Sequence, residues 1–254
     1  MNTDNNTPHR GIYLLPNLFT TAALFSGFYA IIAAVNSKFE IAAIAIFIAM
    51  VLDGLDGRVA RWTNTQSEFG AQYDSLADLV SFGLAPSLVV YLWALVHMKE
   101  VTLAWGKLGW MVAFIYVACA ALRLARFNVQ HEVVDKRYFI GLPSPASAAL
   151  MVGMVWMFSV LGVSGEEVQI PALLMTLFAG LLMVSNIKFY SFKDFDFRSK
   201  VPHLFILGVA LVFALTAIAP SKVLFTVFLI YAFSGPAFWI IEKTPLKHLI
   251  NRKS

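Results

Sequence analysis

The sequence predicts an all-α membrane protein, a polytopic bundle of about eight transmembrane helices. Hydrophobic residues make up 59% of the 254-residue chain, and charged residues make up 13%. The mean hydropathy is +0.73. Soluble domains carry about 25% charged residues, so this chain has too few to cover a surface that faces water. The excess apolar side chains must therefore face lipid.

Eight apolar segments are long enough, or nearly so, to cross a hydrocarbon core of about 30 Å. Backbone polar groups in lipid must be hydrogen-bonded within the protein, so each segment is predicted to be a helix. No polar linker divides the chain, and we expect one transmembrane domain over residues 1–254. The segments cover residues 18–35, 41–61, 73–98, 110–126, 146–161, 172–186, 203–219 and 223–241.

The positions of Lys and Arg predict the orientation in the membrane. If the N-terminus is cytoplasmic, Lys38, Lys99, Lys107 and Lys222 fall on the far side, and the rest of the 19 Lys and Arg residues fall on the cytoplasmic side. The positive-inside rule then places both termini in the cytoplasm. The net charge of +4 is explained by this distribution, and we expect no nucleic-acid partner. The polar first ten residues predict no cleavable signal peptide.

Two single residues add limits. Cys119 is the one cysteine of the sequence, which excludes an intramolecular disulfide and a cysteine metal site. Pro86 lies inside the segment 73–98 and predicts a kink in that helix, because proline lacks a backbone N–H group.

Four carboxylates lie in or beside apolar segments, and their spacing indicates a cluster. Asp53 and Asp56 are three residues apart and Asp74 and Asp78 are four apart, so each pair lies on one helix face. The short segment 61–68 allows the two helices to run antiparallel, which brings the four side chains together near the cytoplasmic boundary. A charge in a membrane costs about 2.5–3.5 kcal/mol on insertion scales. Four of them need a compensating positive charge.

Converging carboxylate oxygens are ligands for Mg²⁺ or Mn²⁺. Zinc is disfavoured, because no Cys or His is placed to assist. Two other interpretations stay open on the aspartates alone. They could pair helices without any chemistry, although four like charges would repel each other. They could also form the cation or proton sites of an ion-coupled transporter.

The residues between the aspartates fit the pattern D-x2-D-G-x2-A-R-x8-G-x3-D-x3-D. This pattern is the signature of the CDP-alcohol phosphotransferases, and the chain resembles that family over roughly residues 13–204. Small residues at two of these positions let a nucleotide approach the helix backbone, or alternatively let helices pack closely. The arginine can bind a phosphate or alternatively snorkel to the membrane surface. The matching residues are Asp53, Asp56, Gly57, Ala60, Arg61, Gly70, Asp74 and Asp78.

The resemblance implies a role for each of these residues. The first three aspartates would bind divalent metal, while Asp78 would deprotonate the acceptor hydroxyl and lie near or on a second metal. The segment 16–20 resembles the family's N-terminal element near the nucleotide, although Asn17 could alternatively cap a helix. The residues implied to bind the CDP-lipid are Asn17, Thr20, Gly57, Ala60, Arg61, Ser67 and Gly70.

Further segments resemble the serine-accepting branch of the family. They are residues 79–87, 123–128, 139–145 and 188–193. The resemblance implies transfer of a phosphatidyl group from CDP-diacylglycerol to L-serine by a homodimer in the bacterial cytoplasmic membrane, with the active site on the cytoplasmic side.

Three residues are candidates for contacts with the acceptor. Arg123 and Arg126 could bind a carboxylate or a lipid phosphate, or could reflect topology alone. Ser81 could orient the acceptor or pack against a helix. The same chemistry with glycerol 3-phosphate or inositol phosphate is an alternative that would favour a more basic pocket.

Overall fold

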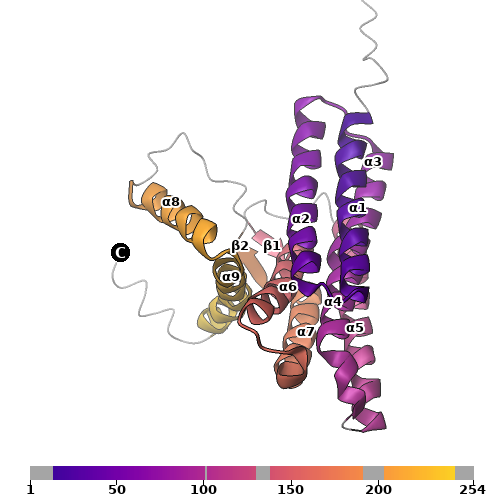
Figure 1. Ribbon diagram of the computed structural model, residues 1–254. Helices are drawn as coiled ribbons and strands as arrows, with labels where there is room; N and C mark the ends of the chain where they lie inside the picture. The colour runs from indigo at the N-terminus through magenta and orange to yellow at the C-terminus, as the bar shows by residue number, and fades with distance from the viewer. Residues whose placement is uncertain (1–13, 101, 130–137, 191–202, 244–254) are drawn as a thin grey trace, which may run out of the picture.

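The computed structural model describes residues 14–100, 102–129, 138–190 and 203–243, and these are almost entirely helical (Figure 1). The predicted all-α class is confirmed. Seven of the predicted apolar segments each lie on one helix, apart from one or two residues at some ends, and the segment 73–98 is divided among several helical pieces. The helices are α1 (Leu14–Val35), α2 (Phe39–Trp62), α3 (Glu68–Asp78), α4 (Ala85–Trp93), α5 (Leu103–Val129), α6 (Ser144–Val160), α7 (Gln169–Val184), α8 (His203–Ile218) and α9 (Pro220–Lys243).

Five stretches among the described residues are long and apolar enough to cross a membrane: Pro16–Val35, Glu68–Trp93, Leu103–Val129, Gly165–Val184 and Pro220–Ile241. This result supports an integral membrane protein. Helix α2 is not among them and carries two aspartates and two arginines in its C-terminal half, and α6 has 17 residues. The number of eight spans therefore stays a prediction.

Helices α1 and α2 form an antiparallel pair that packs through small side chains (Figure 1). Ala30, Ala42 and Ala49 are fully buried, which lets the two backbones approach closely. The hydroxyl of Ser26 donates to the carbonyl of Ala45 at 2.7 Å and adds a polar link between the helices. The pair is therefore fixed in register without large interlocking side chains.

Helix α3 continues into α4 through a π-helical turn at Leu79–Leu84. Pro86 follows this turn, so the predicted irregularity takes the form of a wider winding just before the proline. The hydroxyl of the fully buried Tyr116 in α5 donates to the carbonyl of Phe82 at 3.0 Å. This bond satisfies a backbone acceptor inside the turn and holds α5 against it.

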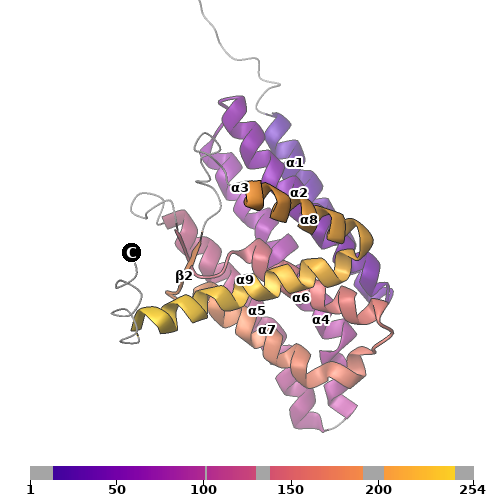
Figure 2. The ribbon, with the colours of Figure 1, turned by 90° about the vertical axis from the view of Figure 1, so that its left-hand side faces the viewer.

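Two short antiparallel strands were not predicted: β1 (Tyr138–Ile140) and β2 (Lys188–Tyr190). Three residues are too few to show the alternation that marks a strand in sequence. Phe189 of β2 is fully buried, and the hydroxyl of Tyr231 in α9 donates to the carbonyl of Tyr190 at 3.1 Å. Helix α9 also packs along α6 and crosses the front of the molecule in Figure 2.

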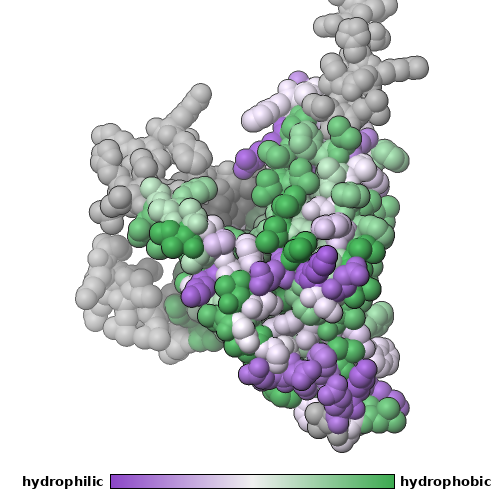
Figure 3. Space-filling view, viewed as in Figure 1, coloured by the Kyte–Doolittle hydropathy of each residue, from purple (hydrophilic) through white to green (hydrophobic). Residues whose placement is uncertain are grey.

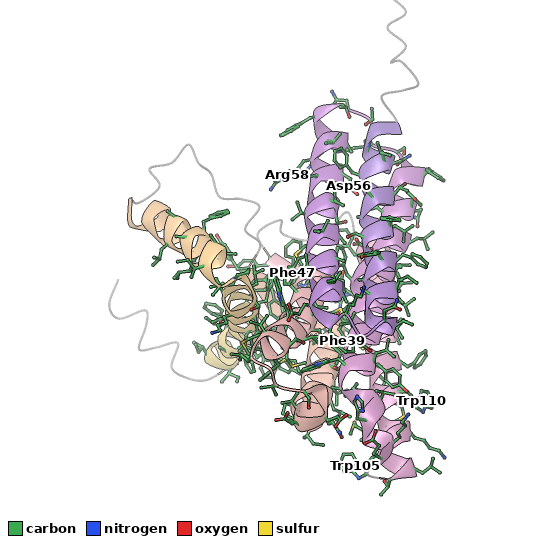
Figure 4. All side chains as sticks on the ribbon, viewed as in Figure 1. Phe39, Phe47, Asp56, Arg58, Trp105 and Trp110 are labelled. Carbon is green, nitrogen blue, oxygen red and sulfur yellow. The ribbon has the colours of Figure 1, made fainter. Side chains whose placement is uncertain are left out.

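The surface is largely hydrophobic, and the two ends of the bundle differ. Figure 3 shows a mostly hydrophobic surface over α1 and α2, with hydrophilic residues gathered lower in the view. In Figure 4, Asp56 and Arg58 lie toward one end of α2, whereas Phe39 lies at its other end and Trp105 and Trp110 lie farther in that direction. The aspartate motif is thus at the end of the bundle opposite the start of α5.

The contact between α1 and the π-helical turn yields a prediction about stability. A Cβ atom on Gly27 would lie 2.7 Å from the backbone Cα of Ser81, so Gly27→Ala should force the two segments apart. We expect a loss of about 1–3 kcal/mol, seen as a lower melting temperature in detergent. Gly208→Ala is the control, because nothing lies within 4 Å of its added Cβ. An unchanged melting temperature for Gly27→Ala would contradict this packing.

Candidate active site

The turn between α2 and α3 explains how the two aspartate pairs come to face each other. Asn64 lies two residues after the end of α2 and has a left-handed backbone conformation, with a φ of 52°. The backbone N–H of Thr65 donates to the carbonyl of Ala60 at 3.0 Å, and that of Asn64 donates to Arg61 at 3.4 Å. These two bonds form a Schellman motif, in which asparagine tolerates the left-handed conformation. The chain therefore reverses within a few residues.

Ser67 and Gly70 define the start of α3. Ser67 is the N-cap residue, and its hydroxyl accepts a hydrogen bond from the Gly70 N–H at 3.0 Å. A Cβ on Gly70 would lie 3.1 Å from Ser67 Oγ and 3.6 Å from Asn17 Oδ1. Glycine at this position therefore lets α3 begin close to α1 without crowding the cap.

Helix α1 contacts both aspartate-bearing helices through hydroxyl groups. Thr20 donates to Asp56 Oδ2 at 2.7 Å, and Thr21 shares a 2.9 Å hydrogen bond with the Tyr73 hydroxyl. Thr20 was expected to contact the nucleotide, and the structure gives it a partner among the aspartates. Asn17 lies inside α1, which begins at Leu14, so it is not the N-cap of that helix.

The carboxylates converge as the spacing predicted. Single oxygens of Asp53, Asp56 and Asp74 all lie within 4.8 Å of one another. Asp78 lies close enough for its charge to interact with Asp53 and Asp74. Asp56 is 6% exposed, so the repulsion is only weakly screened by water.

The chemistry of this cluster fits a divalent cation. Asp74 Oδ1 is buried and has no hydrogen-bond partner among the described residues, which leaves an acceptor available to a metal. Three hard oxygen donors with no His or Cys among them suit Mg²⁺ or Mn²⁺. The residues present would therefore hold such an ion.

A pocket of about 420 Å³ adjoins the cluster. It is bounded by α1, the end of α2, the start of α3 and the end of α5. All seven residues expected to bind the CDP-lipid line it, as do three of the four aspartates, and Asp53 lies outside the lining. The lining residues are Pro16, Asn17, Thr20, Asp56, Gly57, Ala60, Arg61, Thr65, Gln66, Ser67, Gly70, Ala71, Asp74, Ser75, Asp78, Leu124, Phe127 and Asn128.

Gly57 and Arg61 shape one wall of this pocket. A Cβ on Gly57 would have nothing within 4 Å, so the space beside it is open. The Nε of Arg61 donates to the Gly57 carbonyl at 2.9 Å, which folds the side chain back along α2 beside that space. The arginine is exposed, and its guanidinium is the one basic group in the described lining.

The three acceptor candidates do not line the pocket. Ser81 is 1% exposed and donates to the Ala23 carbonyl at 3.2 Å, which is the contact of a helix-packing serine. Arg123 is buried, donates to Ser144 Oγ at 2.9 Å, and interacts electrostatically with Asp78. Arg126 donates to Asn186 Oδ1 at 2.8 Å. Their direct contact with an acceptor stays a prediction.

The pocket lining also contains residues of α3 and α5 that the sequence did not single out as binding residues. Ser75 follows the third aspartate directly, and Phe127 and Asn128 end the segment 123–128 that was singled out for its resemblance. A signal was therefore present in both places. These signals could not identify the residues as pocket residues, because nothing in the sequence says that the ends of α3 and α5 face one cavity.

Comparison with known proteins identifies the family. Residues 13–185 match the profile that describes CDP-alcohol phosphatidyltransferases. The chain belongs to this family. Its members are enzymes, so the chain is an enzyme, and the transporter interpretation has no support from the comparison.

Three relatives carry one name, CDP-diacylglycerol–serine O-phosphatidyltransferase. The chain is similar to that of Helicobacter pylori (strain J99), with 37% identity over 236 residues that cover 92% of this chain and 94% of the relative. It is 34% identical over 190 residues to that of Methanocaldococcus jannaschii, and the match covers 75% of this chain and 80% of the relative. It is 35% identical over 181 residues to that of Bacillus subtilis (strain 168), and the match covers 70% of this chain and 91% of the relative.

The open space at Gly57 predicts separate effects on activity and stability. Gly57→Ala should raise thermal stability, because alanine in a helix is favoured over glycine by about 0.5–1 kcal/mol. The same methyl group should lower activity and raise the KM for the CDP-lipid, because it enters the pocket. Gly54→Ala is the matched control: it is exposed on the same helix, has open space, and does not line the pocket. Equal activity of the two variants would show that the space is not used.

The cluster also predicts how stability responds to divalent ions. Without them, Asp74→Asn should be at least as stable as the parent, because one repelling charge is removed. With Mn²⁺ at about 100 times its Kd, the parent should gain about 2.7 kcal/mol, and the variant should gain much less. Thermal melts with EDTA and with Mn²⁺ measure this. Glu40→Gln, on an exposed residue in the first turn of α2, should keep the full gain. An equal gain for Asp74→Asn would exclude Asp74 as a ligand.

Proposed function

We propose that the protein transfers the phosphatidyl group of CDP-diacylglycerol to the hydroxyl of L-serine and releases phosphatidylserine and CMP. The observation that carries this proposal is that one pocket is lined by three of the four aspartates and by all seven predicted CDP-lipid contacts. The names of the relatives support serine as the acceptor.

The lining of the pocket supports a proposed binding position for the pyrophosphate and for the cytidine of CDP-diacylglycerol. The pyrophosphate would lie over Asp53, Asp56 and Asp74, with the cytidine against Gly57 and Arg61. Divalent ions, when bound, would neutralise the pyrophosphate and stabilise charge on the reacting phosphorus. Thr20 holds Asp56 in place through the 2.7 Å hydrogen bond, so this ligand is oriented before any substrate arrives.

Asp78 is the proposed general base. It lines the pocket one turn along α3 from Asp74, where an acceptor hydroxyl could reach it. In the proposed step, Asp78 takes the proton from the serine hydroxyl, and the serine oxygen forms a bond to the lipid-proximal phosphorus. The bond from that phosphorus to the bridging oxygen breaks, and CMP leaves with the electron pair. The buried Arg123 behind Asp78 offsets part of the negative charge of the cluster.

The wider arrangement is also a proposal. We place both termini and the pocket on the cytoplasmic side of a bacterial inner membrane, with about eight spans in one domain over residues 1–254. In this position a lipid-borne nucleotide and a water-soluble amino acid can meet. A homodimer is proposed on the resemblance to the family alone.

An acceptor that carries a phosphate is the alternative. Glycerol 3-phosphate or inositol phosphate would favour several basic groups in the pocket. Among the described lining residues, Arg61 is the one basic side chain, and the motif assigns it to the donor. The lining therefore favours an acceptor without a phosphate.

A panel of acceptors tests this function. The purified protein is incubated with CDP-diacylglycerol, Mn²⁺ or Mg²⁺, and either L-serine, glycerol 3-phosphate or inositol phosphate, and CMP release is measured. We expect release with serine and formation of phosphatidylserine. If CMP is released only with glycerol 3-phosphate or inositol phosphate, serine is not the acceptor. If no acceptor causes CMP release, the proposed activity is rejected.

Replacement of the base should separate chemistry from binding. Asp78→Asn keeps the size of the side chain but loses the proton acceptor, so turnover should fall by at least about 100-fold. Binding of the CDP-lipid should persist. Glu68→Gln, at the exposed start of the same helix, should keep full turnover. Retained turnover in Asp78→Asn would remove this residue from the proposed role.

A further inference from the structure

Ser75 and Asn128 form a hydrogen-bonded polar pair in the lining of the pocket. Ser75 belongs to α3 and Asn128 to the end of α5, and both line the cavity. The Nδ2 of Asn128 lies 3.0 Å from Ser75 Oγ, and Asn128 Oδ1 lies 3.2 Å from the same atom. Neither residue belongs to the aspartate motif or to the predicted CDP-lipid contacts. The pair therefore needs its own explanation.

The hydrogen-bonding capacity of the pair is not used up within the protein. Ser75 Oγ also lies 3.0 Å from the carbonyl of Ala71, and a hydroxyl has one hydrogen to donate. If that hydrogen goes to Ala71, Ser75 accepts one N–H from Asn128. One N–H and the carbonyl oxygen of Asn128 then have no partner among the described residues. A donor and an acceptor are thus presented together at the pocket wall.

The position of the pair relative to Asp78 matches the size of a small acceptor. Ser75 and Asp78 are three residues apart on α3, which places their Cβ atoms about 5–6 Å from each other. An amino acid whose hydroxyl is at Asp78 and whose α-carbon lies on the Ser75 side would bring its carboxylate and ammonium groups toward Asn128. Because Asn128 is uncharged, it can bind a zwitterion without adding to the negative charge of the cluster.

We infer that Asn128, held by Ser75, is a specificity-determining residue that binds the amino-acid end of the acceptor. Its free N–H donates to the α-carboxylate, and its carbonyl oxygen accepts from the α-ammonium. This inference rests on the proposed function and names the group that selects serine. It assigns recognition of the carboxylate to a neutral amide, which differs from the expectation for Arg123 and Arg126.

Kinetics with serine and two truncated analogues test the inference. Ethanolamine lacks the carboxylate, and 3-hydroxypropionate lacks the ammonium group. In Asn128→Ala, the KM for serine should rise about tenfold or more, because hydrogen bonds to charged groups are lost. The KM for CDP-diacylglycerol should stay within about twofold. The preference of the parent for serine over ethanolamine should fall by the part of this factor that the carboxylate contact supplies, and the preference over 3-hydroxypropionate by the part that the ammonium contact supplies. A merely structural change would leave both preferences intact.

Two more variants keep the test decisive if Asn128→Ala folds poorly. Asn128→Asp has the same shape but no N–H group and a negative charge, so it should disfavour serine more than ethanolamine. Ser75→Ala releases the amide and should raise the KM for serine by a smaller factor. Asn36→Ala, in the exposed turn after α1, is the control and should match the parent.

The outcomes separate this inference from the proposed function. An active parent whose Asn128 variants keep the KM for serine and the preference over both analogues would overturn the inference alone. A parent that releases no CMP with serine would overturn the proposed function and the inference with it. A KM for serine that rises while the preference over ethanolamine stays intact would also overturn the assignment to the carboxylate.

Discussion

The repulsion among four carboxylates is the constraint on which the rest of the site depends. Oxygens of three of them, on the neighbouring helices α2 and α3, lie within 4.8 Å of one another, and the fourth is near enough to interact. Such a cluster is stable when positive charge compensates it. The buried Arg123 supplies part of this charge, and the unpartnered Asp74 Oδ1 marks where a cation would supply more.

The surrounding helices are arranged to hold this cluster in place. The Schellman turn and the Ser67 cap reverse the chain between α2 and α3, so two pairs of aspartates with ordinary helical spacing become one site. Helix α1 is hydrogen-bonded to both of these helices, through Thr20 to Asp56 of α2 and through Thr21 to Tyr73 of α3. Because hydroxyl groups make these links, they orient the side chains without adding charge. Small residues along α1 and α2 let the backbones come close enough for these short contacts.

The walls of the pocket differ in the chemical groups that they present. The α2 wall offers open backbone beside Gly57 and one arginine, which suits a large anionic nucleotide. The ends of α3 and α5 add the uncharged Ser75–Asn128 pair to the lining, on the same helix α3 that carries Asp74 and Asp78. The π-helical turn begins directly after Asp78, and α5 is fixed against it by Tyr116. This contact fixes the position of α5 relative to Asp78, the proposed base on α3.

The sequence by itself determined the class of the fold and the core of the site. A chain with few charges and long apolar segments must place those segments in lipid as helices. A helix puts residues three or four apart on one face, so the spacing of the aspartates predicted that they converge. The tertiary structure decided what depends on contacts between distant segments. Ser81 and Ser75 are both serines on the helical stretch that carries Asp78, yet one packs against Ala23 and the other faces the pocket, because α1 covers one side of that stretch and α5 meets the other. The strands β1 and β2 and the burial of Arg123 also arise from such contacts, which local pattern does not encode.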